Sequence, residues 1–141
     1  MTSTSAMETI DRYYELLAAR DRDGLHQILS PDIVVTYWGQ PGELPWAGTF
    51  TGLDGFDQFL AAVSELLDIV EVVRLRVVAD DDAVVIPCRG QWRVKATGEV
   101  VEAGMVNVFE VTDGLISAYD LHVDTAAFVA ALNRSGATSA D

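Results

Sequence analysis

Apolar residues in the first half of the chain recur at helical spacing. Ile10, Tyr13, Tyr14 and Leu17 fall on one face of a helix, which predicts an amphipathic helix over about residues 7–20. A short second helix is expected after an aspartate-rich turn that offers capping oxygens. A third helix is expected from its apolar stripe, which consists of Phe56, Phe59, Leu60, Val63 and Leu67.

The second half alternates between apolar and polar residues, as strands with one buried face do. The alternating segments are 70–79, 83–94, 100–111 and 115–123, and a β-branched and aromatic segment at 33–38 predicts an earlier strand. Helices followed by a meander of antiparallel strands predict an α+β fold. We expect a single domain over residues 1–141, with an ordered core of about 7–134 and a short C-terminal helix.

Alternation also predicts which side chains face the helices, because successive residues of a strand point to opposite sides. Along the strand at 84–94, one set is apolar and includes Cys88, Gly90 and Trp92. The other set ends in Arg-Gln-Arg. We therefore expect the apolar set to lie on the concave, helix-covered face.

Composition and charge narrow the functional classes. Half of the 141 residues are hydrophobic, enough for a sizeable core. Nine basic and 22 acidic residues give a net charge of −13, which disfavours nucleic acid and anionic membrane surfaces as partners. The single cysteine cannot form an internal disulfide, and two histidines without helical pairing disfavour a metal site. We expect a soluble, cytoplasmic protein without metal or cofactor.

The C-terminal segment carries a family resemblance. Residues 107–124 contain two alternating strands around an Asp113-Gly114 turn and run directly into a short helix. Together with the opening segment 10–17 and the turn at 20–24, this pattern resembles the SnoaL-like and ketosteroid-isomerase-like branch of the nuclear transport factor 2-like superfamily. The resemblance covers about residues 7–132. It implies a cone-shaped, curved antiparallel sheet that encloses a ligand pocket with the N-terminal helices.

The resemblance to ketosteroid isomerase suggests candidate chemistry. In that family a tyrosine of the first helix and a carboxylic acid donate hydrogen bonds to the substrate oxygen, and an aspartate of the first strand moves the proton. Tyr13 and Asn107 stand at the two donor positions, whereas Tyr37 stands near the position of the aspartate. The resemblance therefore implies an oxyanion clamp without the base of a true ketosteroid isomerase.

Two other members of the superfamily offer further comparisons. Limonene epoxide hydrolase is similar from residue 86 onward, but Cys88, Gly90 and Leu121 replace its catalytic arginine and two aspartates, which excludes its mechanism. SnoaL-type cyclases place a catalytic aspartate on or near the last strand. Asp120 and Asp124 are the candidates here, although alternation directs Asp120 outward and Asp124 is well placed to cap a helix.

The loop between residues 39 and 52 is long and rich in glycine and proline, and such loops often cover binding sites. The charged residue of this loop is Glu43, which lies near Trp38, Trp46 and Phe50 in the sequence. A carboxylate among aromatic rings would have a raised pKa and could act as a general acid or base. The alternative is a solvated loop residue.

Two functions of different classes remain open. The first is a SnoaL-like enzyme that performs cofactor-free isomerisation, cyclisation, dehydration or ring opening on an apolar polyketide-, terpenoid- or steroid-like metabolite, with Tyr13, Asn107 and Glu43 as catalytic candidates. The second is a non-catalytic binding module for a small apolar ligand, favoured by the lack of an inward-facing carboxylate on the strands. For both, the expected pocket residues are Tyr37, Trp38, Trp46, Phe56, Cys88, Trp92, Met105, Phe109, Tyr119 and Leu121.

The opposite face of the sheet is expected to carry Val106 and Val108 beside Asp120 and His122. Valines on a solvent-facing sheet suggest a covered surface, so we expect a homodimer through this face. Sheet-to-sheet dimers are common among the proteins that this chain resembles. The alternative is a solvated face, on which Asp120 and His122 could form a carboxylate–imidazole pair.

Overall fold

The computed structural model describes residues 6–40 and 42–135. These residues form four helices and seven strands. The helices are α1 (Ala6–Ala19), α2 (Arg22–Ile28), α3 (Gly52–Leu66) and α4 (Thr125–Ser135). The strands are β1 (Leu29–Trp38), β2 (Gly48–Thr51), β3 (Leu67–Arg74), β4 (Val78–Ala79), β5 (Ala83–Val94), β6 (Val100–Thr112) and β7 (Leu115–Val123). The predicted α+β class is confirmed.

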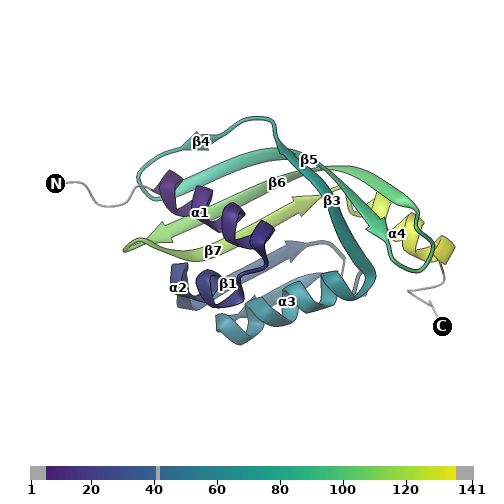
Figure 1. Ribbon diagram of the computed structural model, residues 1–141, viewed down its shortest axis with the longest axis horizontal. Helices are drawn as coiled ribbons and strands as arrows, with labels where there is room; N and C mark the ends of the chain where they lie inside the picture. The colour runs from purple at the N-terminus through teal and green to yellow at the C-terminus, as the bar shows by residue number, and fades with distance from the viewer. Residues whose placement is uncertain (1–5, 41, 136–141) are drawn as a thin grey trace.

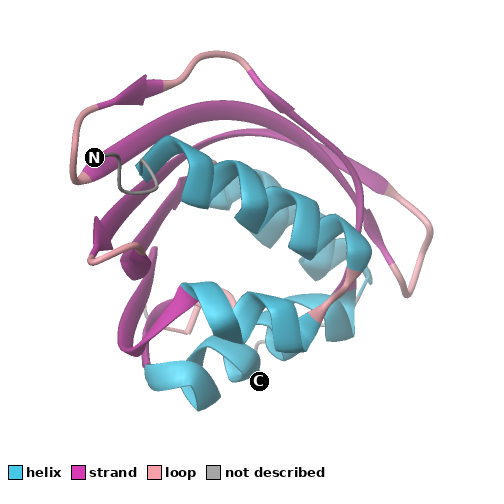
Figure 2. Ribbon diagram, turned by 60° about the vertical axis from the view of Figure 1, so that its left-hand side comes forward, coloured by secondary structure: helices cyan, strands magenta, loops and turns pink. Residues whose placement is uncertain are grey.

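The strands form one sheet in the order β2-β1-β7-β6-β5-β3, and β4 also pairs with β5. The sheet curves around the helices, as Figures 1 and 2 show, with α1 across its concave side and α3 beside β1. The pairing is antiparallel throughout except between β1 and β7, which run parallel. The predicted curved sheet is therefore present, but it is mixed and not purely antiparallel.

Burial along the central strands follows the predicted alternation. Every second residue of β5 from Val84 to Val94 is buried, including Cys88 and Trp92. On β6, Asn107 and Phe109 are buried on the same side, while Val108 between them is more exposed. The concave face was thus predicted correctly for these strands.

The edge of the sheet differs from its prediction, because the expected strand at 70–79 is divided into β3 and β4. The pairing of β3 with β5 ends at Arg74 and Cys88, and the next amide, of Leu75, donates to the carbonyl of Pro87 at 2.9 Å. Proline has no N–H to return a hydrogen bond, so the ladder is interrupted there. Pairing resumes where Val78 meets Val85.

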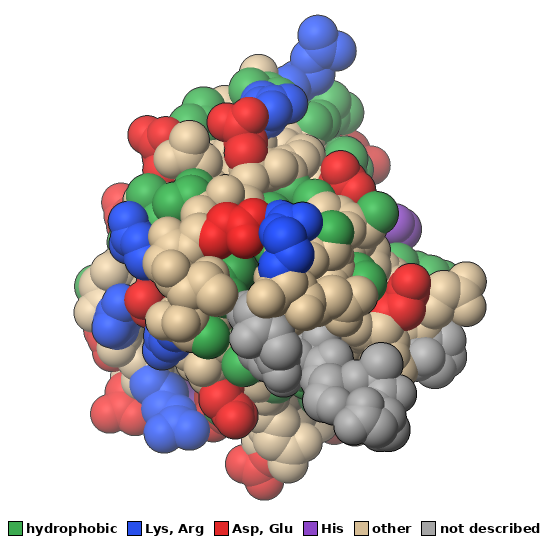
Figure 3. All heavy atoms as spheres, turned by 90° about the vertical axis from the view of Figure 1, so that its right-hand side faces the viewer, with side chains coloured by type: hydrophobic (Ala, Val, Ile, Leu, Met, Phe, Trp, Pro, Cys, Tyr) green, Lys and Arg blue, Asp and Glu red, His purple; other side chains and the backbone are tan. Residues whose placement is uncertain are grey.

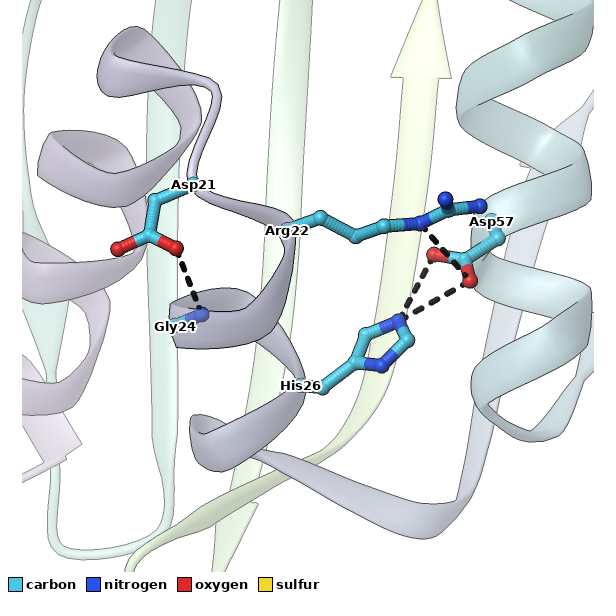
Figure 4. Close-up of polar contacts among 5 residues, drawn as sticks. All are labelled: Asp21, Arg22, Gly24, His26 and Asp57. Atoms are coloured by element: carbon cyan, nitrogen blue, oxygen red, sulfur yellow. Dashed lines mark hydrogen bonds and ion pairs between the residues drawn. The ribbon is translucent and has the colours of Figure 1, made fainter.

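A cluster of charges connects α2 to α3. Asp21 caps the N-terminus of α2, and its carboxylate accepts a hydrogen bond from the Gly24 amide at 2.9 Å. From the same helix, His26 Nε2 lies 2.9 Å and Arg22 Nε 3.3 Å from the carboxylate of Asp57 on α3, as Figure 4 shows. This bridge holds the short helix against its longer neighbour.

The other end of the molecule is covered by α4, which packs on β5 and β6. Phe128, Ala131 and Leu132 are its buried residues. Arg134 pairs with Glu99, next to the start of β6. Acidic and basic side chains are interspersed on this face, with small apolar areas between them (Figure 3).

Candidate functional site

The interior under α1 combines apolar packing with a few hydroxyl and amide groups. Among the described residues, the buried polar or charged side chains are those of Thr9 and Asn107. Buried hydroxyl groups are also supplied by the aromatic residues Tyr13, Tyr37 and Tyr119. No aspartate, glutamate, histidine, lysine or arginine in the described ranges is buried. The chemistry of this interior therefore depends on neutral hydrogen-bonding groups.

Asn107 and Tyr14 form the central polar contact of this interior. Asn107 lies midway along β6, between Ile86 of β5 and Leu121 of β7, and alternation directs its side chain to the concave face. Its amide Nδ2 donates to the hydroxyl oxygen of Tyr14, on α1, at 2.8 Å. The contact joins two segments that are 93 residues apart in the sequence.

The other polar atom of the same amide is unsatisfied. Asn107 is 2% exposed, and its Oδ1 has no hydrogen-bond partner among the described residues. A buried acceptor without a donor costs about 1–3 kcal/mol, so such atoms are uncommon in native structures. Asn107 therefore presents a free acceptor inside the protein.

Tyr13 takes a different position from the one expected. Its ring packs edge-on against Phe109 at 5.5 Å and Tyr119 at 5.6 Å, and Phe109 stacks on Tyr119 at 4.4 Å. Its hydroxyl has Tyr119 as its hydrogen-bond partner. The predicted convergence of Tyr13 and Asn107 on one point is thus corrected, because the amide bonds to Tyr14 instead.

Tyr14 is the residue that the sequence interpretation missed. It belongs to the same helical stripe as Tyr13, but the resemblance assigned the donor role to its neighbour. Adjacent helical residues are separated by about 100°, yet both rings reach the interior, with centroids 5.3 Å apart. The available signal was that Tyr14 belongs to the apolar stripe of this helix, and the structure shows it half-buried. We call Tyr13, Tyr14, Asn107, Phe109 and Tyr119 the tyrosine cluster.

Burial keeps the hydroxyls of this cluster neutral. It raises the pKa of Tyr13, Tyr14 and Tyr119 well above the ordinary tyrosine value. The hydrogen bond from Asn107 partly offsets the effect of burial on the pKa of Tyr14. These groups can donate hydrogen bonds at neutral pH but cannot act as bases.

Two side chains from neighbouring strands, Arg74 of β3 and Cys88 of β5, contact Tyr14. The guanidinium carbon of Arg74 lies 5.2 Å from the centroid of the Tyr14 ring, a cation–π contact, and Arg74 also pairs with Asp11 at 2.8 Å. Cys88 lies opposite Arg74 in the sheet and is a hydrogen-bond partner of the Tyr14 hydroxyl. Burial raises the pKa of the Cys88 thiol, so it is a weak acceptor here and not a nucleophile.

A second aromatic group, which we call the tryptophan cluster, lies under α4 and consists of Tyr37, Trp46, Trp92 and Phe128. Phe128 packs edge-on against Trp92 at 5.1 Å and Trp46 at 6.5 Å, and Trp46 packs against Tyr37 at 6.2 Å. The Trp92 ring covers Gly90, where an added Cβ would come within 2.2 Å of the ring. The predicted inward direction of Trp92 agrees with its burial.

The remaining predicted pocket residues are divided between the interior and the surface. Phe56 and Leu121 are buried and Met105 is half-buried, so their positions fit the expected interior. The prediction that Trp38 lines the pocket is corrected, because Trp38 is 55% exposed on the convex face. Its Nε1 donates to Asp120 there at 3.2 Å, and its ring stacks on His122. It follows Tyr37 in β1, which points inward, so alternation directs Trp38 outward.

The predicted environment of Glu43 is also corrected. It is exposed, and its carboxylate accepts a hydrogen bond from the amide of Gln40 at 3.0 Å within the loop. The aromatic residue of this loop that enters the core is Trp46, which is 1% exposed. The expected environment of a carboxylate among aromatic rings is therefore not formed.

Two kinds of feature are absent from the part of the chain that the structure describes. No three histidine, cysteine, aspartate or glutamate side chains there are grouped so that they could hold a metal ion. No helix there has the length and apolar character needed to cross a membrane.

Comparison with known proteins is consistent with this architecture. A family model for the SnoaL-like domain matches residues 10–119. An NTF2-like protein from Burkholderia xenovorans LB400 is similar over 93% of this chain and 98% of its own, with a TM-score of 0.78 and 22% identity. A protein from Rhodopseudomonas palustris, provisionally named an isomerase, is similar over 96% and 99%, with a TM-score of 0.79 and 17% identity.

A third similar structure, from Mesorhizobium loti, is provisionally named a SnoaL-like polyketide cyclase. It covers 86% of this chain and 99% of its own, with a TM-score of 0.68 and 19% identity. No curated protein matches the sequence. At these identities the structural similarity indicates a shared fold.

Proposed function

The chain belongs to the SnoaL-like domain family, and from that premise we propose that it is a cofactor-free enzyme of the isomerase or cyclase type, acting on a bulky, mostly apolar ring metabolite. The names of the similar proteins from Rhodopseudomonas palustris and Mesorhizobium loti support this class of reaction. The substrate would occupy the interior of the cone, with one oxygen atom directed at Tyr14.

The single observation that carries the proposal is the hydrogen bond from Asn107 to Tyr14 in an otherwise apolar interior. A tyrosine whose oxygen accepts a hydrogen bond is a stronger donor through its own O–H, because the bond stabilises negative charge on that oxygen. Its partner Cys88 is a weak acceptor, which a substrate oxygen could displace. Tyr14 would then polarise a carbonyl oxygen by donating a hydrogen bond to it.

Hydrogen exchange of a ring ketone tests this role. We expect the protein to accelerate the exchange of the α-protons of 2-tetralone in D₂O, followed by NMR, because polarising the carbonyl makes these protons more acidic toward a hydroxide ion or buffer base, which takes the proton. Tyr14→Phe should slow the catalysed rate by about 10²- to 10³-fold, as the loss of one oxyanion donor does. Thr112→Val, which removes an exposed hydroxyl at the end of β6, is the matched control. Equal rates in wild type and Tyr14→Phe would contradict the proposal.

A second candidate function is a non-catalytic binding module for a small apolar ligand. It is favoured by one observation: the described interior contains no buried carboxylate or histidine that could move a proton. In the same experiment, a binding module would bind 2-tetralone but would leave its exchange at the rate of the buffer. Binding and exchange measured on one sample therefore distinguish the two functions.

We also propose a homodimer formed through the convex face of the sheet. Val106 and Val108 are half-buried in the single chain, opposite His122 and Asp120 on β7. The exposed ring of Trp38 extends this surface. Val106→Glu would bury a charge in such an interface and should give monomers by light scattering. Thr112→Glu is the control, and a folded Val106→Glu variant that stays dimeric would reject the interface.

A further inference from the structure

We infer that the ligand oxygen bound between Tyr14 and Asn107 belongs to a neutral hydroxyl group on a ring, an enol or a phenol, and not to an ether or an oxyanion. This inference rests on the proposed ligand site, but it concerns the protonation state and hydrogen-bonding character of the ligand and not its turnover. It follows from the roles that the two polar atoms of Asn107 have in the structure.

The two atoms of the amide are not equivalent. Nδ2 is already used, because it donates to the Tyr14 oxygen at 2.8 Å, whereas Oδ1 has no partner among the described residues. Only a donor satisfies a carbonyl oxygen. A ligand that offers only lone pairs would leave Oδ1 without a donor, and its oxygen would be repelled by Oδ1. The hydrogen of a hydroxyl group would instead bond to Oδ1.

One hydroxyl group can reach both residues. The two heavy atoms of a primary amide are about 2.2 Å apart, so Asn107 Oδ1 lies no more than about 5 Å from the Tyr14 oxygen. An oxygen atom between them can stand at hydrogen-bond distance, about 2.8 Å, from each. It would accept from the O–H of Tyr14 and donate its own hydrogen to Asn107 Oδ1.

The electrostatics of the interior also favour a neutral ligand. The tyrosines of the cluster resist ionisation, which means that this environment penalises negative charge on oxygen. The cation that contacts the Tyr14 ring, Arg74, has a side chain that is 39% exposed and is paired with Asp11. A phenolate would therefore lose hydration without gaining a buried counter-charge, and it would face the Asn107 carbonyl oxygen.

The opposite orientation of the amide gives an opposite expectation. If Tyr14 donated to Oδ1, the two N–H groups of Nδ2 would be the free partners, and they would favour a carbonyl oxygen or a phenolate. Whether the site binds a hydroxyl group or an oxyanion more tightly therefore shows whether Asn107 directs its carbonyl oxygen or its amide nitrogen at the ligand. This makes the inference testable with the unmutated protein.

Binding of three probes provides the test, measured by calorimetry. We expect 2-naphthol to bind about tenfold more tightly than 2-methoxynaphthalene, because only the naphthol can donate a hydrogen bond to Asn107 Oδ1. A nitrophenol should bind more weakly, by about tenfold or more, above its pKa than below it. Equal binding of naphthol and ether, or tighter binding of the nitrophenolate, would overturn the inference.

Variants assign the preference to Asn107. Asn107→Leu has a similar shape without polar atoms, so it should bind naphthol and ether equally, while Thr112→Val should keep the wild-type preference. A retained preference in a folded Asn107→Leu variant would also overturn the inference. Hydrogen exchange of 2-tetralone is independent of this result: its absence rejects the enzyme, whereas loss of the hydroxyl preference with Tyr14-dependent exchange rejects only the inferred ligand class.

Discussion

Tyr37 and Asn107 are two buried polar residues on the same face of the same sheet, yet their surroundings differ. The Tyr37 hydroxyl, in the tryptophan cluster, has Trp46 and Thr125 as hydrogen-bond partners, and the indole N–H of Trp46 can only donate. In the tyrosine cluster, Asn107 has one satisfied atom and one unpartnered atom. The first arrangement is complete without a ligand, and the second is not.

This difference separates a structural role from a binding role within one interior. A satisfied polar group fixes the positions of its neighbours and leaves nothing for a ligand to bind. A buried polar group without a hydrogen-bond partner reduces stability. Its presence in the protein is explained if a bound ligand supplies the missing partner. We therefore assign the tryptophan cluster to the stability of the fold and the tyrosine cluster to ligand recognition.

The largest expected effect concerns the tryptophan cluster. Trp46 is 1% exposed and contacts Tyr37 and Phe128, so Trp46→Ala should lower the free energy of unfolding by about 3–5 kcal/mol. With both variants made in the monomeric Val106→Glu background, Trp38→Ala removes the same side chain from the convex face and should cost about 1 kcal/mol or less. Urea unfolding of both variants measures the difference. A similar loss in the two variants would contradict the assigned role of Trp46.

The sequence was sufficient to predict the general architecture because periodicity depends on local geometry. Alternation along β5 and β6 directed Cys88, Trp92 and Asn107 to the concave face, and the structure confirms their burial. The helical stripe of α1 was also correct. These predictions needed only the repeat of a strand or a helix.

Contacts between distant segments could not be obtained in this way. Tyr13 and Tyr14 both belong to the apolar stripe, and the choice between them depends on how α1 crosses β6, which no local pattern contains. Glu43 was expected among aromatic rings because they are near in sequence, but the loop turns Trp46 inward and leaves the carboxylate exposed. The interruption at Pro87 depends on which strand pairs with β5.

The next effect concerns the ionisation of the tyrosines at high pH. All four tyrosines have raised pKa values in the folded protein, whereas those of the unfolded chain ionise near the ordinary value of about 10. Above that pH the unfolded state loses protons that the folded state retains, so stability falls as pH rises. Each tyrosine contributes at most about 1.4 kcal/mol per pH unit.

Ultraviolet difference absorbance of tyrosinate measures this directly. The folded protein should show little tyrosinate at pH values where the urea-unfolded protein is half ionised. Urea titrations on either side of that pH should show the matching loss of stability, and Tyr14→Phe should reduce it. A tyrosine that ionises normally in the folded protein would show that one of the two clusters is open to water.

The smallest expected effect compares the two buried polar groups themselves. Tyr37→Phe removes a hydrogen-bond partner from the buried Trp46 indole, so the variant should lose about 1–3 kcal/mol of stability. Asn107→Leu removes an unpartnered acceptor together with one hydrogen bond to the half-buried Tyr14, and these contributions oppose each other. We expect the stability of Asn107→Leu to remain within about 1 kcal/mol of the wild type, or to rise. Urea unfolding of both variants, with naphthol binding on the same samples, gives the comparison. If Asn107→Leu were as destabilising as Tyr37→Phe, Asn107 would be a structural residue like Tyr37, and the distinction between the clusters would fail.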